Sequence, residues 1–345
     1  MDIWNWVWDI QWELRDSGHE ALADFMDRIP SDTVAGHHDR VDLYADEAIA
    51  LARDVGNPWV EIFLRHWRLQ STVLHRQDAK RSIREAVELL EFSHRPENRD
   101  CPQSICAVQD LASCYGAFDG PGFADERISV CRENLERIDA RWPCYECIGA
   151  EYAQALLDAE RFSECQEFVE SCDRAMVEAG EGKSTSDLLL VRIMLYVRTG
   201  EYERARKYAE LADKGRYIEK RLRVAKAAIE SADGKHREAL EMLPDYAEIE
   251  NQGVCHYLWC EVMCRAWNSG TGVSEDDIAN VARIALDMEE RGAYRQALQT
   301  NAWLVDIFRR DGRKEAAACL AAMKRVSEHL NKDLGASELI ASLET

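Results

Sequence analysis

The sequence predicts an all-α fold, built as a succession of antiparallel helical hairpins. Apolar residues recur at spacings of three and four, and no alternating run is bounded by hairpin turns, so we expect almost no strand. A typical helical run is Ile62, Trp67, Leu69, Val73 and Leu74. All seven prolines fall between helical patterns, which leaves the intervening segments free to be helices. They are Pro30, Pro58, Pro96, Pro102, Pro121, Pro143 and Pro244.

The periodicity predicts eight hairpins and one final helix, 335–344. The first pair has a break near Ser17-Gly18 in its first member. The predicted pairs are 2–28 with 38–55, 58–77 with 79–94, 101–117 with 122–140, 143–159 with 161–179, 184–199 with 201–213, 216–232 with 235–243, 247–268 with 274–291, and 293–310 with 313–331. Units that repeat at roughly 31 to 46 residues are typical of an α-solenoid.

We expect one domain spanning residues 1–345. In this scheme a capping hairpin occupies 1–56, the repeat hairpins occupy 57–331, and a capping helix occupies 332–345. The ends of such an array need polar outer faces, because each terminal unit has only one neighbour.

Several turns carry a shared motif. In TGEYERARKYAELA (199–212), Gly200 stands at the turn, Tyr202 follows it, and Ala205 and Ala212 occupy two small-residue positions. DGKHREALEML (233–243) and DGRKEAAACLAAM (311–323) repeat the pattern. These segments resemble the turn and second helix of a tetratricopeptide repeat, in the long-repeat form found in bacterial regulators. The resemblance implies a right-handed solenoid of about eight hairpins, whose first helices line a concave groove.

The charge balance limits the classes of partner. Lys and Arg total 43 against 64 Asp and Glu, a net charge of −21. Such a surface repels nucleic-acid phosphates and anionic lipid, so we expect neither, and a basic protein or peptide is the more natural partner. No apolar run is long enough to span a membrane, and Asp2 and Asp9 do not fit a secretory signal. We therefore expect a cytoplasmic protein whose twelve cysteines are reduced thiols.

Two short motifs suggest chemistry that their contexts do not support. AGEGKSTSD (179–187) contains GKS, but Val177 stands where a phosphate-binding loop needs glycine, and a helix precedes it. Cys144 and Cys147 form a CxxC without further zinc ligands nearby. Cys165 and Cys172 occupy the small-residue positions of their repeat, so we expect them to be buried in the core.

Two histidine-containing groups are candidate metal sites. His256, Cys260 and Cys264 share one helical face, which fits either three zinc ligands or a packed stripe containing one hydrogen-bonded histidine. His37 and His38 lie in a predicted loop, and Asp39 after them is expected to cap the next helix. We expect no cofactor and no catalytic residue.

Arg216, Lys220 and Arg223 form a basic stripe on a helix that the resemblance places along the groove. One interpretation is a contact with an acidic segment of a partner. The other is a solvated face balanced by neighbouring glutamates.

Four of the ten tryptophans lie in the first twelve residues. Trp4, Trp8 and Trp12 fall on one helical arc of about 80°, separate from the arc of Ile3 and Val7. We expect segment 38–55 to cover these indoles. The alternative is a surface for a partner or for a homodimer, where tryptophan is common.

These observations favour a non-enzymatic scaffold, adaptor or regulator that binds proteins or peptides in its groove. One alternative is an acidic inhibitor or immunity-type protein that neutralises a basic partner. Others are a peptide-sensing regulator and, through the His256 face, a metal-dependent enzyme.

Overall fold

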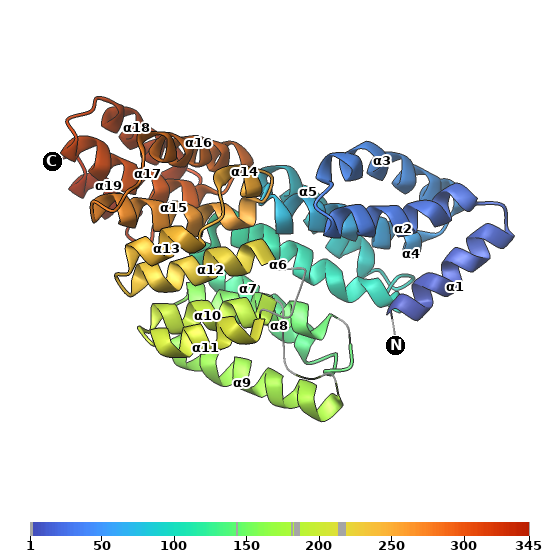
Figure 1. Ribbon diagram of the computed structural model, residues 1–345. Helices are drawn as coiled ribbons and strands as arrows, with labels where there is room; N and C mark the ends of the chain where they lie inside the picture. Colours follow the sequence, from blue (N-terminus) through green and yellow to red (C-terminus); the bar gives the residue numbers. More distant parts are fainter. Residues whose placement is uncertain (1–2, 143, 181, 183–186, 213–218, 345) are drawn as a thin grey trace.

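The computed structural model describes residues 3–142, 144–180, 182, 187–212 and 219–344. Every regular element in these ranges is helical, so the prediction of an all-α fold is confirmed for the described part of the chain (Figure 1). Within the same ranges no helix combines the length and the apolar character needed to cross a lipid bilayer.

The first part of the chain is divided at the break expected near Ser17-Gly18. The predicted segment 2–28 is two helices, which separate at Gly18, where φ is +83°. Pro30 lies inside the second of them with its ring buried, so the prediction that every proline falls between helices is wrong there; the helix continues although proline cannot donate a backbone hydrogen bond. The elements are α1 (Ile3–Asp16), α2 (Glu20–Val34), α3 (His38–Val55), α4 (Pro58–Leu69), the π-helix η1 (Gln70–His75) and α5 (Ala79–Ser93).

The middle of the chain follows the predicted pairs. Helix α7 ends five residues before the predicted position 140, because the chain turns after Leu135. The elements are the 3₁₀ turn η2 (Pro102–Ile105), α6 (Cys106–Asp119), the 3₁₀ turn η3 (Gly120–Phe123), α7 (Ala124–Leu135), α8 (Tyr145–Asp158), α9 (Phe162–Ala179), α10 (Asp187–Arg198), α11 (Tyr202–Ala212), α12 (Glu219–Ala232) and α13 (His236–Met242).

The last third contains long amphipathic helices with well-defined caps. The predicted helix 247–268 is divided, and its short first part is fixed by a capping box between Asp245 and Glu248. Ser274 and Asp277 form a second capping box at the start of α16. The elements are α14 (Tyr246–Ile249), α15 (Gly253–Asn268), α16 (Glu275–Arg291), α17 (Tyr294–Arg310), α18 (Glu315–Ser327) and α19 (Ala336–Ser342).

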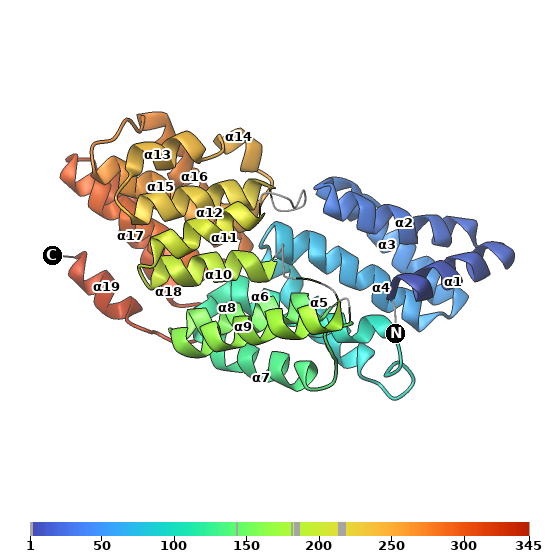
Figure 2. The ribbon, with the colours of Figure 1, turned by 60° about the horizontal axis from the view of Figure 1, so that its bottom comes forward.

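The first helices of six successive hairpins form a closed circuit. In chain order α6, α8, α10, α12, α15 and α17 each contact the next, and α17 returns to contact α6. We call these six helices the inner circuit. Figures 1 and 2 show the result: the C-terminal helices lie beside α5 and α6, while α1 to α4 extend at one end of the molecule.

Buried polar contacts hold the two ends of the circuit together. Asp119, at the end of α6, is fully buried and accepts a hydrogen bond of 2.7 Å from Arg295 Nε of α17. The same carboxylate accepts a hydrogen bond from the backbone N–H of Asn331, at 2.8 Å. Arg291 donates to the carbonyl oxygen of Arg76 at 3.0 Å. We call this set of contacts the seam.

At the seam, two glycines lie very close to other groups, one to a backbone carbonyl and one to a carboxylate. A Cβ on Gly253 would lie 2.2 Å from the carbonyl oxygen of Arg76, and a Cβ on Gly122 would lie 2.0 Å from the carboxylate of Asp119. Neither distance is compatible with a side chain, so these positions require glycine for close approach.

Candidate ligand cavity

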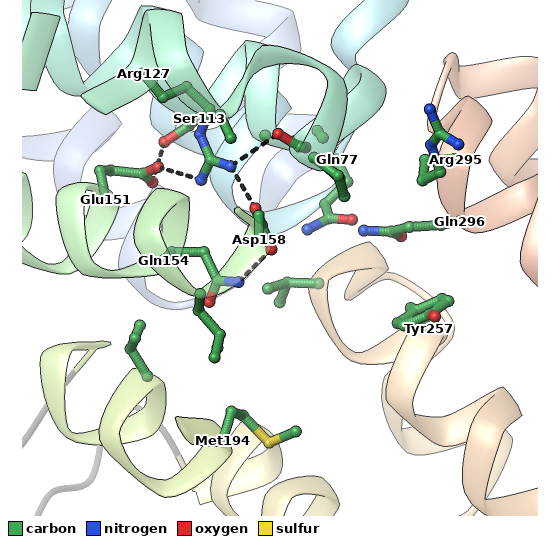
Figure 3. A pocket seen from close by; sticks show the side chains of 18 of the residues that line it. Gln77, Ser113, Arg127, Glu151, Gln154, Asp158, Met194, Tyr257, Arg295 and Gln296 are labelled. Carbon is green, nitrogen blue, oxygen red and sulfur yellow. Dashed lines mark hydrogen bonds and ion pairs between the residues drawn. The ribbon is translucent and has the colours of Figure 1, made fainter. Parts of the chain in front are cut away.

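The inner circuit surrounds a cavity of about 1080 Å³ (Figure 3). Its wall is contributed by all six helices of the circuit, together with η1, η3, α7 and residues 332–339. Cavities that bind small ligands usually measure roughly 300–1,000 Å³, so this one is at or above the upper end of that range.

Arg127 of α7 forms the polar wall of the cavity. Its side chain is almost completely buried and makes ion pairs with Asp158 and, at 3.3 Å, with Glu151, both from α8 (Figure 3). Ser113 donates to Glu151 at 2.6 Å, and Gln154 donates to Asp158 at 2.9 Å. Burial raises the pKa of Glu151, and Arg127 opposes that shift. One cation therefore lies between two carboxylates, and its own Nε has no hydrogen-bond partner among the described residues.

Glutamine side chains are concentrated in the cavity wall. Five of the chain's ten glutamines line it: Gln77, Gln109, Gln154, Gln296 and Gln299. Figure 3 shows the side-chain amides of Gln77 and Gln296 pointing toward one another from opposite parts of the wall. Gln296 Oε1 is buried and accepts no hydrogen bond within the described ranges. This oxygen has almost no exposed surface, so a ligand can reach it only when the side chain or its neighbours shift, and the unpaired acceptor then favours such a contact.

Apolar side chains form another large part of the wall. It is formed by aliphatic and thioether side chains from the inner circuit, with Tyr257 beside them (Figure 3). These residues are Leu157, Leu190, Val191, Met194, Val224, Leu258 and Leu298. The wall therefore combines apolar with many polar and charged side chains, which makes it more polar than a usual small-molecule site.

Backbone strain is also concentrated at the cavity. In the described part of the chain three residues other than glycine have positive φ, Gln77 at 55°, Glu160 at 57° and Leu334 at 45°, and all three line the cavity. Such conformations cost free energy and tend to cluster at functional sites. Glu160 occupies the turn position that Gly200 and other glycines occupy in later hairpins.

The π-helix η1 contributes to the same wall through Val73 and Leu74. It continues α4 directly, and Gln77 follows it by two residues. Short π-helical segments within α-helices occur frequently at functional sites.

The predicted basic stripe faces away from this cavity. Lys220 Nζ donates to the carbonyl oxygen of Glu248 at 2.6 Å, and Arg223 forms an ion pair of 2.7 Å with the Glu248 carboxylate. Arg216 lies outside the described residues. Arg221 is the residue of α12 that lines the cavity, where it pairs with Asp187. Lys220 and Arg223 are thus balanced by a neighbouring glutamate, and contact of this stripe with a partner stays a prediction.

His256, Cys260 and Cys264 lie in the core of the C-terminal third. His256 Nε2 is 3.0 Å from the carbonyl oxygen of Ile249, and burial lowers the pKa of this histidine to about 4. Burial also raises the pKa of both thiols. Within the described ranges, no three His, Cys, Asp or Glu side chains are grouped so as to hold a metal ion. This arrangement matches the packed-stripe interpretation.

The CxxC does not act as a unit. Cys144 forms a disulfide with Cys106, while Cys147 lines the cavity. The expectation that all cysteines are reduced is wrong for this pair, because the starts of α6 and α8 pack side by side and bring the two sulfurs together. Cys165 and Cys172 are buried in an apolar cluster, as predicted.

His38 does not lie in a loop. It begins α3, is buried, and its Nδ1 is 2.8 Å from Ser71 Oγ of η1. Burial lowers the pKa of His38 to about 4. Asp39 lies in the first turn of α3, as expected. Most of the GKS-containing loop, residues 181 and 183–186, lies outside the described residues.

Trp4, Trp8 and Trp12 are exposed to 43%, 64% and 69%. The expectation that segment 38–55 covers them is wrong. Helix α2, which begins after the predicted break at Ser17-Gly18, packs against the buried face of α1, and α3 packs instead against α2 and α4.

The residues of the cavity wall were not identified from the sequence, because they come from segments far apart in the chain. One local signal was present. Glu160 stands in a hairpin turn at a position where other turns have glycine. A residue with a side chain at such a position must adopt the left-handed backbone conformation that glycine adopts easily.

No protein-family model matches the chain, and no curated protein matches it significantly.

Proposed function

We propose that this chain is a non-enzymatic binding protein whose inner cavity takes a short peptide. The observation that carries the proposal is the coincidence of the cavity with the strained residues Gln77, Glu160 and Leu334. Strain at a cavity wall is retained when it holds side chains in position for a ligand.

The glutamine amides favour a peptide over other ligands of this size. A side-chain amide has both a donor and an acceptor, as a peptide group has, so the two can pair in register. Gln296 provides an acceptor without a partner in the described part of the chain, and the amide of Gln77 points toward the amide nitrogen of Gln296.

The charges of the wall support a ligand that is nearly neutral. Although the chain has a net charge of −21, the wall contains six acidic and six basic residues. The acidic residues are Asp125, Glu151, Asp158, Glu160, Asp187 and Glu261; the basic residues are Arg127, Arg161, Arg198, Arg221, Arg295 and Lys332. A balanced wall selects against strongly charged ligands.

In this proposal the hairpins are units of a right-handed, tetratricopeptide-like solenoid, and the solenoid curves until its two ends are in contact. Positive φ at Gly200, Gly234 and Gly312, at the turns that carry the motif, is consistent with this. On this basis the protein acts as an adaptor or regulator in a bacterial cytoplasm, and the bound peptide is the signal to which it responds.

The proposal is tested by calorimetric titration with pools of N-acetylated, uncharged tetrapeptides, compared with free amino acids of the same composition. Gln296→Leu removes the unpaired acceptor, and we expect it to weaken peptide binding at least tenfold. Gln166→Leu is the matched control, because Gln166 of α9 does not line the cavity and its amide donates to Glu170 of the same helix. Absence of binding to every pool, or equal binding by both variants, would overturn the proposal.

A further inference from the structure

Helix α1 carries a row of exposed indoles along one face. Trp4, Trp8 and Trp12 follow one another at intervals of four residues, and we call them the Trp surface. Trp4 leans on Trp67 of α4, with ring centroids 6.2 Å apart, while Trp8 and Trp12 are exposed to 64% and 69%. Figures 1 and 2 show α1 at one end of the molecule, and none of its residues lines the cavity. Exposed tryptophan in a contiguous row is typical of an interaction surface.

An acidic stripe runs beside the Trp surface. Asp9, Glu13 and Asp16 are all exposed. At 100° per residue they lie on the arc that follows the indoles, on the side away from the buried face of α1. The helix has one basic residue, Arg15, and Asp24 and Asp27 of α2 bind it at 3.2 and 3.3 Å. A molecule covering the indoles therefore meets negative charge along one edge.

The size of the surface argues against a stable symmetric dimer. From their exposed fractions, the three indoles present on the order of 400 Å². A stable protein–protein interface buries about 800 Å² on each partner. A second copy would also bring a second acidic stripe to the contact, on a chain whose net charge is −21. A single helix or peptide segment fits the area better.

We propose that the Trp surface binds a basic amphipathic segment of another protein. Apolar side chains of that segment pack on Trp8 and Trp12, and its Lys or Arg side chains lie over the indole faces and beside Asp9 and Glu13. A cation over an indole gains from the ring quadrupole, and the neighbouring carboxylates add Coulomb attraction. The cavity and the Trp surface are then two separate sites, so this inference does not depend on the peptide proposal.

The probe is a fluorescein-labelled, 18-residue helical peptide with leucine on one face and lysine on the other. Its counterpart carries glutamate in place of every lysine. Binding is measured by anisotropy at two salt concentrations. We expect the lysine peptide to bind wild-type protein at least tenfold more tightly than the Trp8→Ala/Trp12→Ala variant, and the glutamate peptide not to bind. Asp9→Asn/Glu13→Gln should weaken binding and reduce its dependence on salt.

Leu43→Ala is the matched control, since Leu43 of α3 is a large apolar side chain that is 75% exposed away from α1. It should leave peptide binding unchanged. Equal binding by wild type and the double Trp variant would overturn the proposal. The proposal would also be overturned if sedimentation showed that the wild-type protein is a dimer and the double Trp variant a monomer. Binding to vesicles of anionic lipid that is lost in the double Trp variant would overturn it as well.

Discussion

The carboxylate of Asp119 binds the guanidinium of Arg295, although 176 residues separate them in the sequence. Asp119 has no exposed surface and also accepts hydrogen bonds from the backbone N–H groups of Asn331 and Lys332. Four donors from the last third of the chain, two of them nitrogens of Arg295, thus converge on one residue at the end of α6. The inner circuit is closed at this point.

Asp119→Ala should destabilise the protein by about 3 to 5 kcal/mol, because it leaves a partly buried cation and two backbone donors without their acceptor. The measurement is urea unfolding followed by circular dichroism. Asp125→Ala is the control at the same seam. Asp125 pairs with Lys332 at 3.0 Å but is 77% exposed, so its loss should cost less than about 1 kcal/mol. Equal losses of unfolding free energy in the Asp119→Ala and Asp125→Ala variants would show that the buried carboxylate contributes no more than the exposed one.

Gly253→Ala should destabilise the protein by about 1 to 3 kcal/mol, because the new Cβ cannot lie 2.2 Å from the carbonyl oxygen of Arg76 and the two backbones must separate. Gly149→Ala in α8 is the comparison. A Cβ there meets its nearest atom at 3.6 Å, an ordinary contact, and alanine is the better helix former. We expect Gly149→Ala to raise the melting temperature and Gly253→Ala to lower it.

Glu160→Gly should stabilise the protein by about 1 kcal/mol. Glycine relieves the left-handed strain at φ 57°, and this gain exceeds the extra entropy that glycine loses on folding. Glu160→Gln keeps the strain while removing the charge, so it should not be stabilising. A gain in both variants would point to charge, and not to the backbone, as the source of the effect.

Stability should fall as the pH is lowered from 6.5 toward 4. Burial holds the pKa of His256 at about 4 in the folded protein, below its ordinary value of about 6.5 in the unfolded chain. In that window the unfolded chain binds a proton that the folded protein does not, so this histidine alone costs about 2 kcal/mol by pH 5. The stabilisation that requires a neutral His256 is therefore complete above the unfolded-state pKa of about 6.5 and is lost as the pH falls toward the folded-state pKa of about 4.

His256→Gln provides the test, because an amide can still donate to the carbonyl oxygen of Ile249 and does not titrate. Free energies of unfolding at pH 7, 6 and 5 should decline less steeply in this variant than in wild type. Parallel curves would show that His256 is not the group responsible.

The helices were predictable because their signals are local. Apolar spacing placed α8 and α9 within two residues of their true ends, and glycine at a turn marked the start of α11. The error at α2 has a local cause as well. Pro30 was taken as a terminus, whereas its buried ring is accommodated within the helix.

The cavity could not be predicted because it depends on how far the hairpins curve. Arg127, Gln77 and Gln296 lie far apart in the sequence and meet only when α17 contacts α6. Small differences in the packing angle of each hairpin accumulate around the circuit, and no single segment encodes their sum. The same limit applies at α12, where the spacing of the basic residues defines a stripe but does not show that Arg221 lines the cavity.

The closure of the inner circuit also affects how the protein opens. In a linear array of repeats the last units have one neighbour and exchange their amide hydrogens first, so unfolding proceeds from the ends by fraying. Here α17, near the C-terminal end of the chain, is held on one side by α15 and on the other by α6. Its amides should therefore be among the slowest to exchange, and the six hairpins should open as one cooperative unit.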